Sequence, residues 1–214
     1  MKFPFSLLAN GADPSVMRVD KSSVPQLSLM DLLIDGLDPK RRIRPETSSS
    51  LDNWSRIKLT PAGDVTDIEF SNKDLTGSLQ LEWMPSTVQS VDVSYNAISG
   101  TLNLESLPVS LCRIDLGNNA FEGTVCLTNL PRELKELILS INQLSGQVDL
   151  TKLPEGLHRL QLHRNMFEGW TDFSQLPESL EFLSVSETGL SGMMVVSRGR
   201  SFQVYDSKVK VIYE

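Results

Sequence analysis

The chain has 214 residues, of which 40% are hydrophobic and 22% are charged, and it carries a net charge of -7. This composition is typical of a globular protein, and no apolar run approaches the roughly 18 residues of a membrane span. The negative charge argues against a nucleic-acid partner, because a phosphate backbone attracts basic surfaces. We therefore expect no transmembrane segment and no nucleic acid.

Residues 1–22 show no regular pattern, and we predict that they form a flexible N-terminal arm. Their short apolar stretch is interrupted by Pro4, unlike the apolar region of a secretory signal. The two cysteines, Cys112 and Cys126, are fewer than the disulfide framework of a secreted module would require. We therefore expect an intracellular, cytoplasmic location rather than secretion. The sequon that begins at Asn53 would matter only in the secretory pathway.

Residues 23–64 are predicted to form an N-terminal helical cap. The segment 26–37 is amphipathic and carries apolar side chains at Leu27, Met30, Leu33, Ile34 and Leu37. This spacing predicts a helix that ends near Gly36. The basic run over 40–44 is interpreted as a solvated loop, with a patch for nuclear import or for an anionic partner as the alternative.

Three residue types recur every 23 residues over 65–202, without an insertion. The repeated glycines are Gly77, Gly100, Gly123, Gly146, Gly169 and Gly192. The repeated prolines are Pro85, Pro108, Pro131, Pro154 and Pro177. An apolar residue that opens each unit keeps the same period. A fixed period of this length is typical of a solenoid, so we predict six stacked repeats over 65–202.

The repeated unit reads LxxLxLxxNxLxGxhxLxxLPxx, where h is apolar, and its first eleven positions resemble the core signature of the leucine-rich-repeat family. The part around xLxGx resembles the plant-receptor subtype, and the remainder resembles repeats from unicellular eukaryotes. The resemblance implies a mainly β leucine-rich-repeat solenoid with short parallel strands on its concave face. It also implies that Trp54 seals the first coil, although the cap cysteines of plant-type proteins are missing here.

Alternating apolar residues open each unit and predict a short strand with one face inward. The asparagine that follows, as at Asn142, is expected to bond backbone groups that the turn leaves unpaired. Alternation resumes after each glycine and predicts extended or 3-10 segments on the back, and therefore a gently curved solenoid. Residues 203–214, with Val209 and Val211, are predicted to form a C-terminal closing strand.

The chain offers little material for catalysis. His158 and His163 lie five residues apart in one repeat, and no metal, redox or nucleophile motif is present. The two cysteines are interpreted as packing residues. We therefore predict that the protein is not an enzyme, and that it has no catalytic residues, no metal site and no cofactor.

The residues between the strand leucines form columns on the predicted concave sheet. The first three repeats contribute a predicted acidic patch of Asp67, Glu69, Asp92 and Asp115. The later repeats contribute apolar and basic residues at Ile138, Ile141, Phe182, Arg159, His163 and Arg164. Such columns also occur as a merely solvated face. Apolar residues and arginines together are nevertheless typical of interface centres, so we predict a protein-binding surface from these ten residues.

The sequence thus favours a non-catalytic protein–protein interaction or scaffold module that binds a protein partner on its concave sheet. It leaves open whether the chain acts alone or as a subunit of a larger assembly. The alternative is an extracellular or surface recognition module of the receptor leucine-rich-repeat kind.

Overall fold

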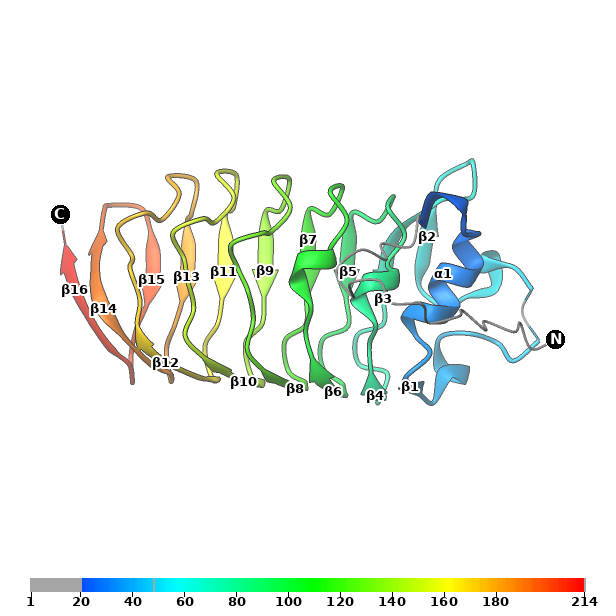
Figure 1. Cartoon of the computed structure of the whole chain (residues 1–214), viewed down its shortest axis with the longest axis horizontal. Helices are drawn as coiled ribbons and strands as arrows, with labels where there is room; N and C mark the ends of the chain where they lie inside the picture. Colours follow the sequence, from blue (N-terminus) through cyan, green and yellow to red (C-terminus); the bar gives the residue numbers. More distant parts are fainter. Residues whose placement is uncertain (1–20, 48, 214) are drawn as a thin grey trace, which may run out of the picture.

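The computed structural model describes residues 21–47 and 49–213, so the predicted arm over 1–22 lies almost entirely outside the described residues. The described chain winds into an elongated solenoid, with a small helical cap at one end and β16 at the other (Figure 1). Two sheets run along its length, and each turn contributes a strand to both. Within 21–47 and 49–213, no helix is long and apolar enough to cross a membrane.

The first sheet, which we call the front sheet, corresponds to the predicted concave sheet. Its strands are β2 (Ile57–Leu59), β3 (Val65–Glu69), β5 (Ser90–Asp92), β7 (Arg113–Asp115), β9 (Glu136–Ile138), β11 (Arg159–Gln161), β13 (Phe182–Ser184) and β15 (Ser201–Gln203). All neighbouring strands are parallel except β2 and β3. From β3 to β13 each residue pairs with the residue 23 positions later, for example Ile68 with Val91. The register therefore follows the repeat.

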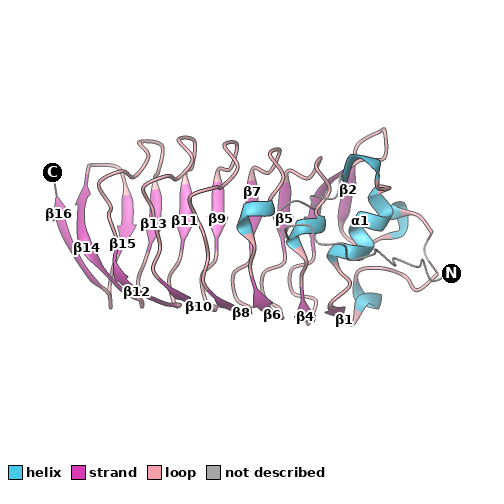
Figure 2. Cartoon of the chain, viewed as in Figure 1, coloured by secondary structure: helices cyan, strands magenta, loops and turns pink. Residues whose placement is uncertain are grey.

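The second sheet, the back sheet, is also eight-stranded. Its strands are β1 (Leu37–Asp38), β4 (Thr76–Ser78), β6 (Ala97–Thr101), β8 (Ala120–Gly123), β10 (Gln143–Gly146), β12 (Met166–Trp170), β14 (Gly189–Val196) and β16 (Lys208–Tyr213). The short 3-10 helices η4 (Leu81–Trp83) and η5 (Leu104–Ser106) follow two of these strands, and no α-helix lies within the described repeats (Figure 2). The predicted extended and 3-10 segments on the back are confirmed.

The back strands pair in a different register from the front strands. Thr76 pairs with Ala97, which lies 21 residues later, although the sequence repeats every 23. From β4 to β14, each back strand is therefore shifted by two residues along its neighbour, and the back strands slope across the solenoid in Figure 1. The turns stack along a nearly straight line, without the bend of a horseshoe (Figure 1).

The interior is a continuous apolar core that runs through all the turns. In the four turns that carry the repeated asparagine, this residue connects the turn to the previous one. In the turn of Asn142, the side-chain Oδ1 accepts a hydrogen bond from the Phe121 N–H at 3.0 Å, and Nδ2 donates to the Leu116 and Leu139 carbonyls at 3.0 and 3.1 Å. Equivalent bonds form in the turns of Asn96, Asn119 and Asn165. The predicted role of the repeated asparagine is confirmed.

The cap contains α1 (Gln26–Leu33) and the 3-10 helices η1 (Lys21–Ser23), η2 (Lys40–Arg42) and η3 (Leu51–Asn53). The prediction that the helix extends to about Gly36 is wrong, because α1 ends at Leu33. The chain then turns so that Leu37 pairs with Gly77 at the end of the back sheet. A side chain at Gly36 would approach the backbone oxygen of Ser78 to 2.6 Å, so this crossing requires glycine.

Trp54 is 4% exposed and joins the same apolar core, as the family resemblance implied. The side-chain Oε1 of Gln26 accepts a hydrogen bond from the Val65 N–H at 2.8 Å, and this bond ties α1 to the first front strand of the repeats. The cap thus covers the apolar face that the first turn would otherwise expose.

Candidate functional site

The register of the front sheet brings the predicted site residues into two columns. The first column runs through Asp67, Ser90, Arg113, Glu136, Arg159 and Phe182. The second column runs through Glu69, Asp92, Asp115, Ile138, Gln161 and Ser184. Seven of the ten predicted site residues lie in these columns. The remaining three, Ile141, His163 and Arg164, follow the strands.

We call the front-sheet side chains of β2, β3, β5 and β7, together with Glu136, the ion-paired half. The Lys58 ammonium lies 3.2 Å from a carboxylate oxygen of Asp67 and 3.1 Å from one of Glu69. These two contacts compensate much of the acidic charge at the start of the predicted acidic patch.

Arg113 performs the same role for the rest of the ion-paired half. Its guanidinium lies 3.7 Å from Asp92, 3.1 Å from Asp115 and 3.2 Å from Glu136, measured to the carboxylate oxygens. The ion-paired half therefore combines five carboxylates with two cations and keeps a net charge of three negative units. The predicted acidic patch is present, but its carboxylates are bound to their own neighbours.

Asp115 is the most constrained carboxylate of this network. Burial raises the pKa of its carboxyl group, and the charges of Asp92 and Glu136 act in the same direction. The Gly117 N–H, which donates to Asp115 at 3.0 Å, and the Arg113 guanidinium oppose that rise in pKa. Overall the pKa of Asp115 is raised, so keeping this carboxylate ionised reduces the stability of the fold.

We call the front-sheet side chains of β9, β11 and β13, apart from Glu136, the aromatic half. The guanidinium carbon of Arg159 lies 4.8 Å from the centroid of the Phe182 ring, within the range of a cation–π contact. Arg159 forms no ion pair with any residue in the described part of the chain. Ile138 and Phe182 are partly exposed on the same face. The aromatic half thus presents an uncompensated cation beside apolar surface.

Ile141 and Arg164 lie on the turn beyond each strand rather than on the sheet itself. The residues at this position all have positive φ: Asn72, Tyr95, Asn118, Ile141, Arg164 and Glu187. Asparagine tolerates this left-handed conformation, but a β-branched side chain is strained there, so Ile141 at φ 58 is an outlier. The Arg164 Nε lies 2.7 Å from a carboxylate oxygen of Glu187, so its charge is compensated.

His163 is half-buried at the rim of the aromatic half. Burial lowers the pKa of its imidazole, and the Arg164 charge adds to that effect. Its Nδ1 is buried and has no hydrogen-bond partner among the described residues. His163 is therefore held mainly neutral and contributes shape more than charge to this surface.

No protein-family model matches the sequence, and no curated protein is similar to it. Solved structures are similar in shape. The Pollen Receptor Kinase 3 structure has a TM-score of 0.64 and 21% identity, over 78% of this chain and 86% of that chain. The leucine-rich-repeat ectodomain of the receptor kinase SOBIR1 from Arabidopsis thaliana has a TM-score of 0.59 and 22% identity, over 78% and 95%. The fold is that of a leucine-rich-repeat protein.

A third structure, the BIR3–SERK2 complex from Arabidopsis thaliana, has a TM-score of 0.55 and 24% identity, over 78% of this chain and 95% of that chain. At such identities these similarities show the leucine-rich-repeat fold alone, and a function must be argued from the residues of the site itself.

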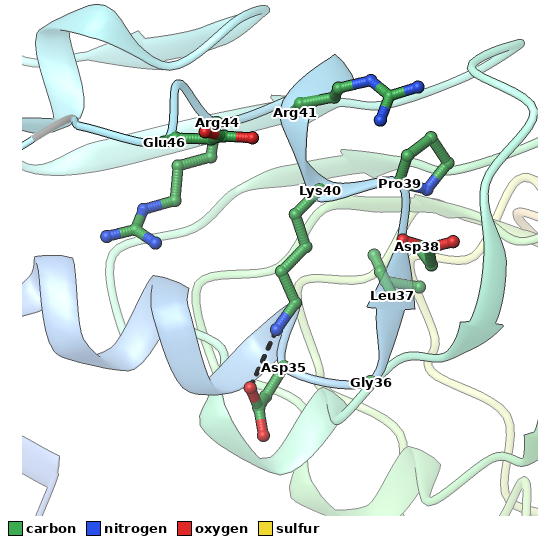
Figure 3. A pocket seen from close by; sticks show the side chains of 9 residues that line it. All are labelled: Asp35, Gly36, Leu37, Asp38, Pro39, Lys40, Arg41, Arg44 and Glu46. Atoms are coloured by element: carbon green, nitrogen blue, oxygen red, sulfur yellow. Dashed lines mark hydrogen bonds and ion pairs between the residues drawn. The ribbon is translucent and has the colours of Figure 1, made fainter. Parts of the chain in front are cut away.

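The cap of the leucine-rich-repeat solenoid carries a shallow hollow of about 640 Å³, which is drawn in Figure 3. Its charged lining mixes both signs: Asp35, Asp38, Lys40, Arg41, Arg44 and Glu46. Lys40 pairs with Asp35 at 2.9 Å, Arg44 pairs with Asp31 at 3.0 Å, and Arg42 pairs with Asp74. Most of the basic run over 40–44 is therefore paired within the cap or with the first repeat, which leaves little charge for an anionic partner.

No cluster of three or more metal-ligating side chains occurs within residues 21–47 and 49–213. Cys112 and Cys126 are both free thiols and are partly buried. The column positions of the site were predictable from the repeat, whereas the pairing partners Lys58 and Glu187 were not identified. For Lys58, the alternation Ile57-Lys58-Leu59 is the signal that places it on a strand beside β3.

Proposed function

We propose that this leucine-rich-repeat solenoid is a non-catalytic module that binds a protein partner on its front sheet, centred on Ile138, Arg159 and Phe182. The observation that carries the proposal is the unpaired Arg159 guanidinium stacked on a partly exposed Phe182 ring. Arginine and aromatic residues dominate the energetic centres of protein interfaces, and Ile138 supplies apolar area beside them.

The strain at Ile141 supports the same surface. A β-branched residue in the left-handed region costs of order 1 to 3 kcal/mol, and such costs concentrate at binding sites. Ile141 follows the strand that carries Ile138 and extends the apolar surface towards the turn. The residues of the ion-paired half supply a weaker, screened negative field beside this centre, which would favour a partner with a basic flank.

The compartment separates two versions of this proposal. The sequence predicts an intracellular interaction or scaffold module, which acts alone or as a subunit of an assembly. One of the similar structures is the ectodomain of the receptor kinase SOBIR1, and another is by name a complex, BIR3–SERK2. An extracellular or surface recognition module therefore fits the fold at least as well as a scaffold does.

The binding surface can be tested by affinity capture from lysate and from secreted material of the cells that make the protein. The wild-type chain is compared with Ile138→Asp/Arg159→Glu, after circular dichroism has shown equal folding. We expect the double variant to lose at least ten times the capture of a partner, because both the apolar contact and the cation are removed.

The matched control is Val109→Asp/Lys152→Glu, which makes the same chemical changes away from the front sheet. Val109 is 80% exposed and Lys152 is also exposed. This control should capture as much partner as the wild type does. Equal capture of partner by all three proteins would disprove the front-sheet assignment. An equal loss of capture in both variants would show that net charge, and not the front sheet, determines binding.

Glycosylation of the exposed Asn53 would distinguish the two compartments. In the secretory pathway the sequon that begins at Asn53 is available for glycosylation, and in the cytosol it is not. Protein from the native cells is treated with an N-glycosidase and compared with an Asn53→Gln variant. If N-glycosidase lowers the mass of the wild type but not of the variant, the recognition module is supported. If the mass of the wild type does not change while a control glycoprotein from the same cells is fully glycosylated, the intracellular scaffold is supported.

A further inference from the structure

The last turn of the solenoid departs from the repeat. On the front sheet Phe182 pairs with Ser201, which lies only 19 residues later, and on the back Ser191 pairs with Lys208, 17 residues later. Strand β14 does not leave the back sheet after its glycine but continues to Val196. The shortened turn therefore stacks two long strands, β14 and β16, over six paired residues.

Strand β16 is the outermost strand of the back sheet (Figure 1), and among the described residues nothing pairs with its outer edge. Natural proteins usually keep such edges short, because an unpaired row of backbone groups recruits other strands. The end strand of the front sheet, β15, follows this rule with three residues, whereas β16 has six. Within the described residues, the back sheet therefore ends in a long unpaired strand edge, at the point where the 23-residue spacing stops.

The two faces of β16 differ in character. Lys208, Lys210 and Ile212 lie on the solvent face and are exposed, as are Met193 and Val195, the partners of Lys210 and Ile212 in β14. Val209 and Val211 lie on the core face and remain half-buried. A strand added to this edge must therefore cover apolar groups on one face and avoid two lysines on the other.

A second copy of β16 meets these conditions in one register. In a symmetric antiparallel pair, residues directly opposite each other share a face, so the pair must be centred on a residue that faces its own copy. Centring on Val209 places Lys208 opposite Lys210, and centring on Lys210 places two copies of Lys210 opposite each other. Both registers oppose like charges, which destabilises a strand pair.

Centring on Val211 removes these clashes. Lys210 then lies opposite Ile212, Val209 opposite Tyr213, and Val211 opposite itself, so the core face carries only valine and tyrosine side chains and no charge. Centring on Ile212 also avoids the lysines but shortens the overlap. We propose that two copies of this protein pair through antiparallel β16 strands centred on Val211, which joins the two back sheets into one continuous sheet.

The dimer can be measured by sedimentation equilibrium from about 1 to 100 μM. We expect the average mass to rise with concentration towards twice the 23.8 kDa of one chain. Val211→Lys places two ammonium groups opposite each other and should leave a monomer over the whole range. Ile212→Glu places a carboxylate opposite Lys210 of the second copy, so it should keep the dimer and make its affinity dependent on salt.

Two cysteine variants test the same register by cross-linking, even if Val211→Lys does not fold. In a background of Cys112→Ser/Cys126→Ser, Val211→Cys faces itself at a Cα separation of about 4.5 to 5.5 Å, which suits a disulfide. Val209→Cys lies on the same face of the same strand but faces Tyr213. Mild oxidation should therefore cross-link the Val211 variant at least ten times faster than the Val209 variant.

A wild-type chain that stays monomeric to 100 μM would overturn the proposal, as would a dimer that Val211→Lys leaves intact. Equal cross-linking of the two cysteine variants would overturn the register and with it the proposal. The front sheet is untouched by these changes, so capture of a partner by Ile138, Arg159 and Phe182 is tested independently.

Discussion

The two halves of the front sheet use the same residue type in opposite ways. Arg113 and Arg159 occupy the same column, two repeats apart. The Arg113 guanidinium contacts three carboxylates, and Arg159 contacts an aromatic ring and no carboxylate within the described residues. The backbone positions are equivalent, so the difference comes from the side chains that surround each arginine in the two columns. A repeat scaffold can therefore assign one arginine to the fold and leave an equivalent arginine for a partner.

This comparison also predicts where the protein tolerates change. In the ion-paired half, removal of a cation leaves partly buried carboxylates without a partner, which destabilises the fold. In the aromatic half, the charge has no partner to lose, so its removal should affect binding more than folding. The two arginines are the most direct test of this division.

The largest effect is expected for Arg113→Ala. The change leaves Asp92, Asp115 and Glu136 close together without their shared cation. The network is about a third exposed at Arg113, so solvent screens part of the loss. We expect the free energy of unfolding to fall by about 1 to 3 kcal/mol, measured by urea denaturation at low salt, with a smaller loss at high salt.

Arg159→Ala is the matched control for this change. It removes one cation–π contact at a partly exposed site, and we expect a loss of about 0.5 to 1 kcal/mol with little dependence on salt. Equal losses of stability for the two variants, or a stronger salt effect for Arg159→Ala, would remove the distinction between the halves.

The next effect is expected at the turn that follows the strands. Ile141 and Asn118 occupy equivalent turn positions with φ of 58 and 54, and they follow strands β9 and β7 of the two halves. Asparagine tolerates this conformation better than isoleucine, so Ile141→Asn should raise the free energy of unfolding by about 1 kcal/mol. Thermal and urea unfolding would measure the gain. If Ile141 serves a partner, the same variant should capture less of it.

The reciprocal variant, Asn118→Ile, should lower the free energy of unfolding by about 1 kcal/mol for the same reason. A stable Asn118→Ile variant would show that the turn accepts branched residues and that Ile141 is not strained. Its binding of a partner should not change, because Asn118 follows a strand of the ion-paired half and not one of the aromatic half.

The sequence predicts what depends on the period and misses what depends on contacts between turns. Apolar spacing gave the strands, the back segments and the columns, because each turn repeats the same local rule. The column of Arg113 was predicted, but its three ion pairs depend on how far a side chain reaches across strands. The pairing of Lys58 was missed because β2 lies ahead of the first repeat and runs antiparallel to it.

The ends of the solenoid show the same limit. The amphipathic pattern over 26–37 favours a longer helix than α1, and the chain leaves it early because Leu37 has a strand partner in Gly77. The length of β14 and β16 also depends on how the two strands pair in the folded protein. Alternation at Val209 and Val211 predicts a strand, but not that the last turn is shortened to lengthen its pairing.

The smallest effect, and the most specific to the ion-paired half, is expected for Asp115→Asn. Because the folded state raises the pKa of the Asp115 carboxyl group, the protonated form stabilises the fold below about pH 3.9, and that contribution is lost as the pH rises through the folded pKa. An amide stays neutral at every pH and can still accept the Gly117 hydrogen bond. The variant should therefore be more stable than the wild type at pH 7, by less than about 1 kcal/mol, and the difference should vanish near pH 3. Urea denaturation at both pH values measures it. A variant that is less stable at pH 7 would mean that the Arg113 contact outweighs burial, and that the ion-paired half stabilises the fold through every one of its charges.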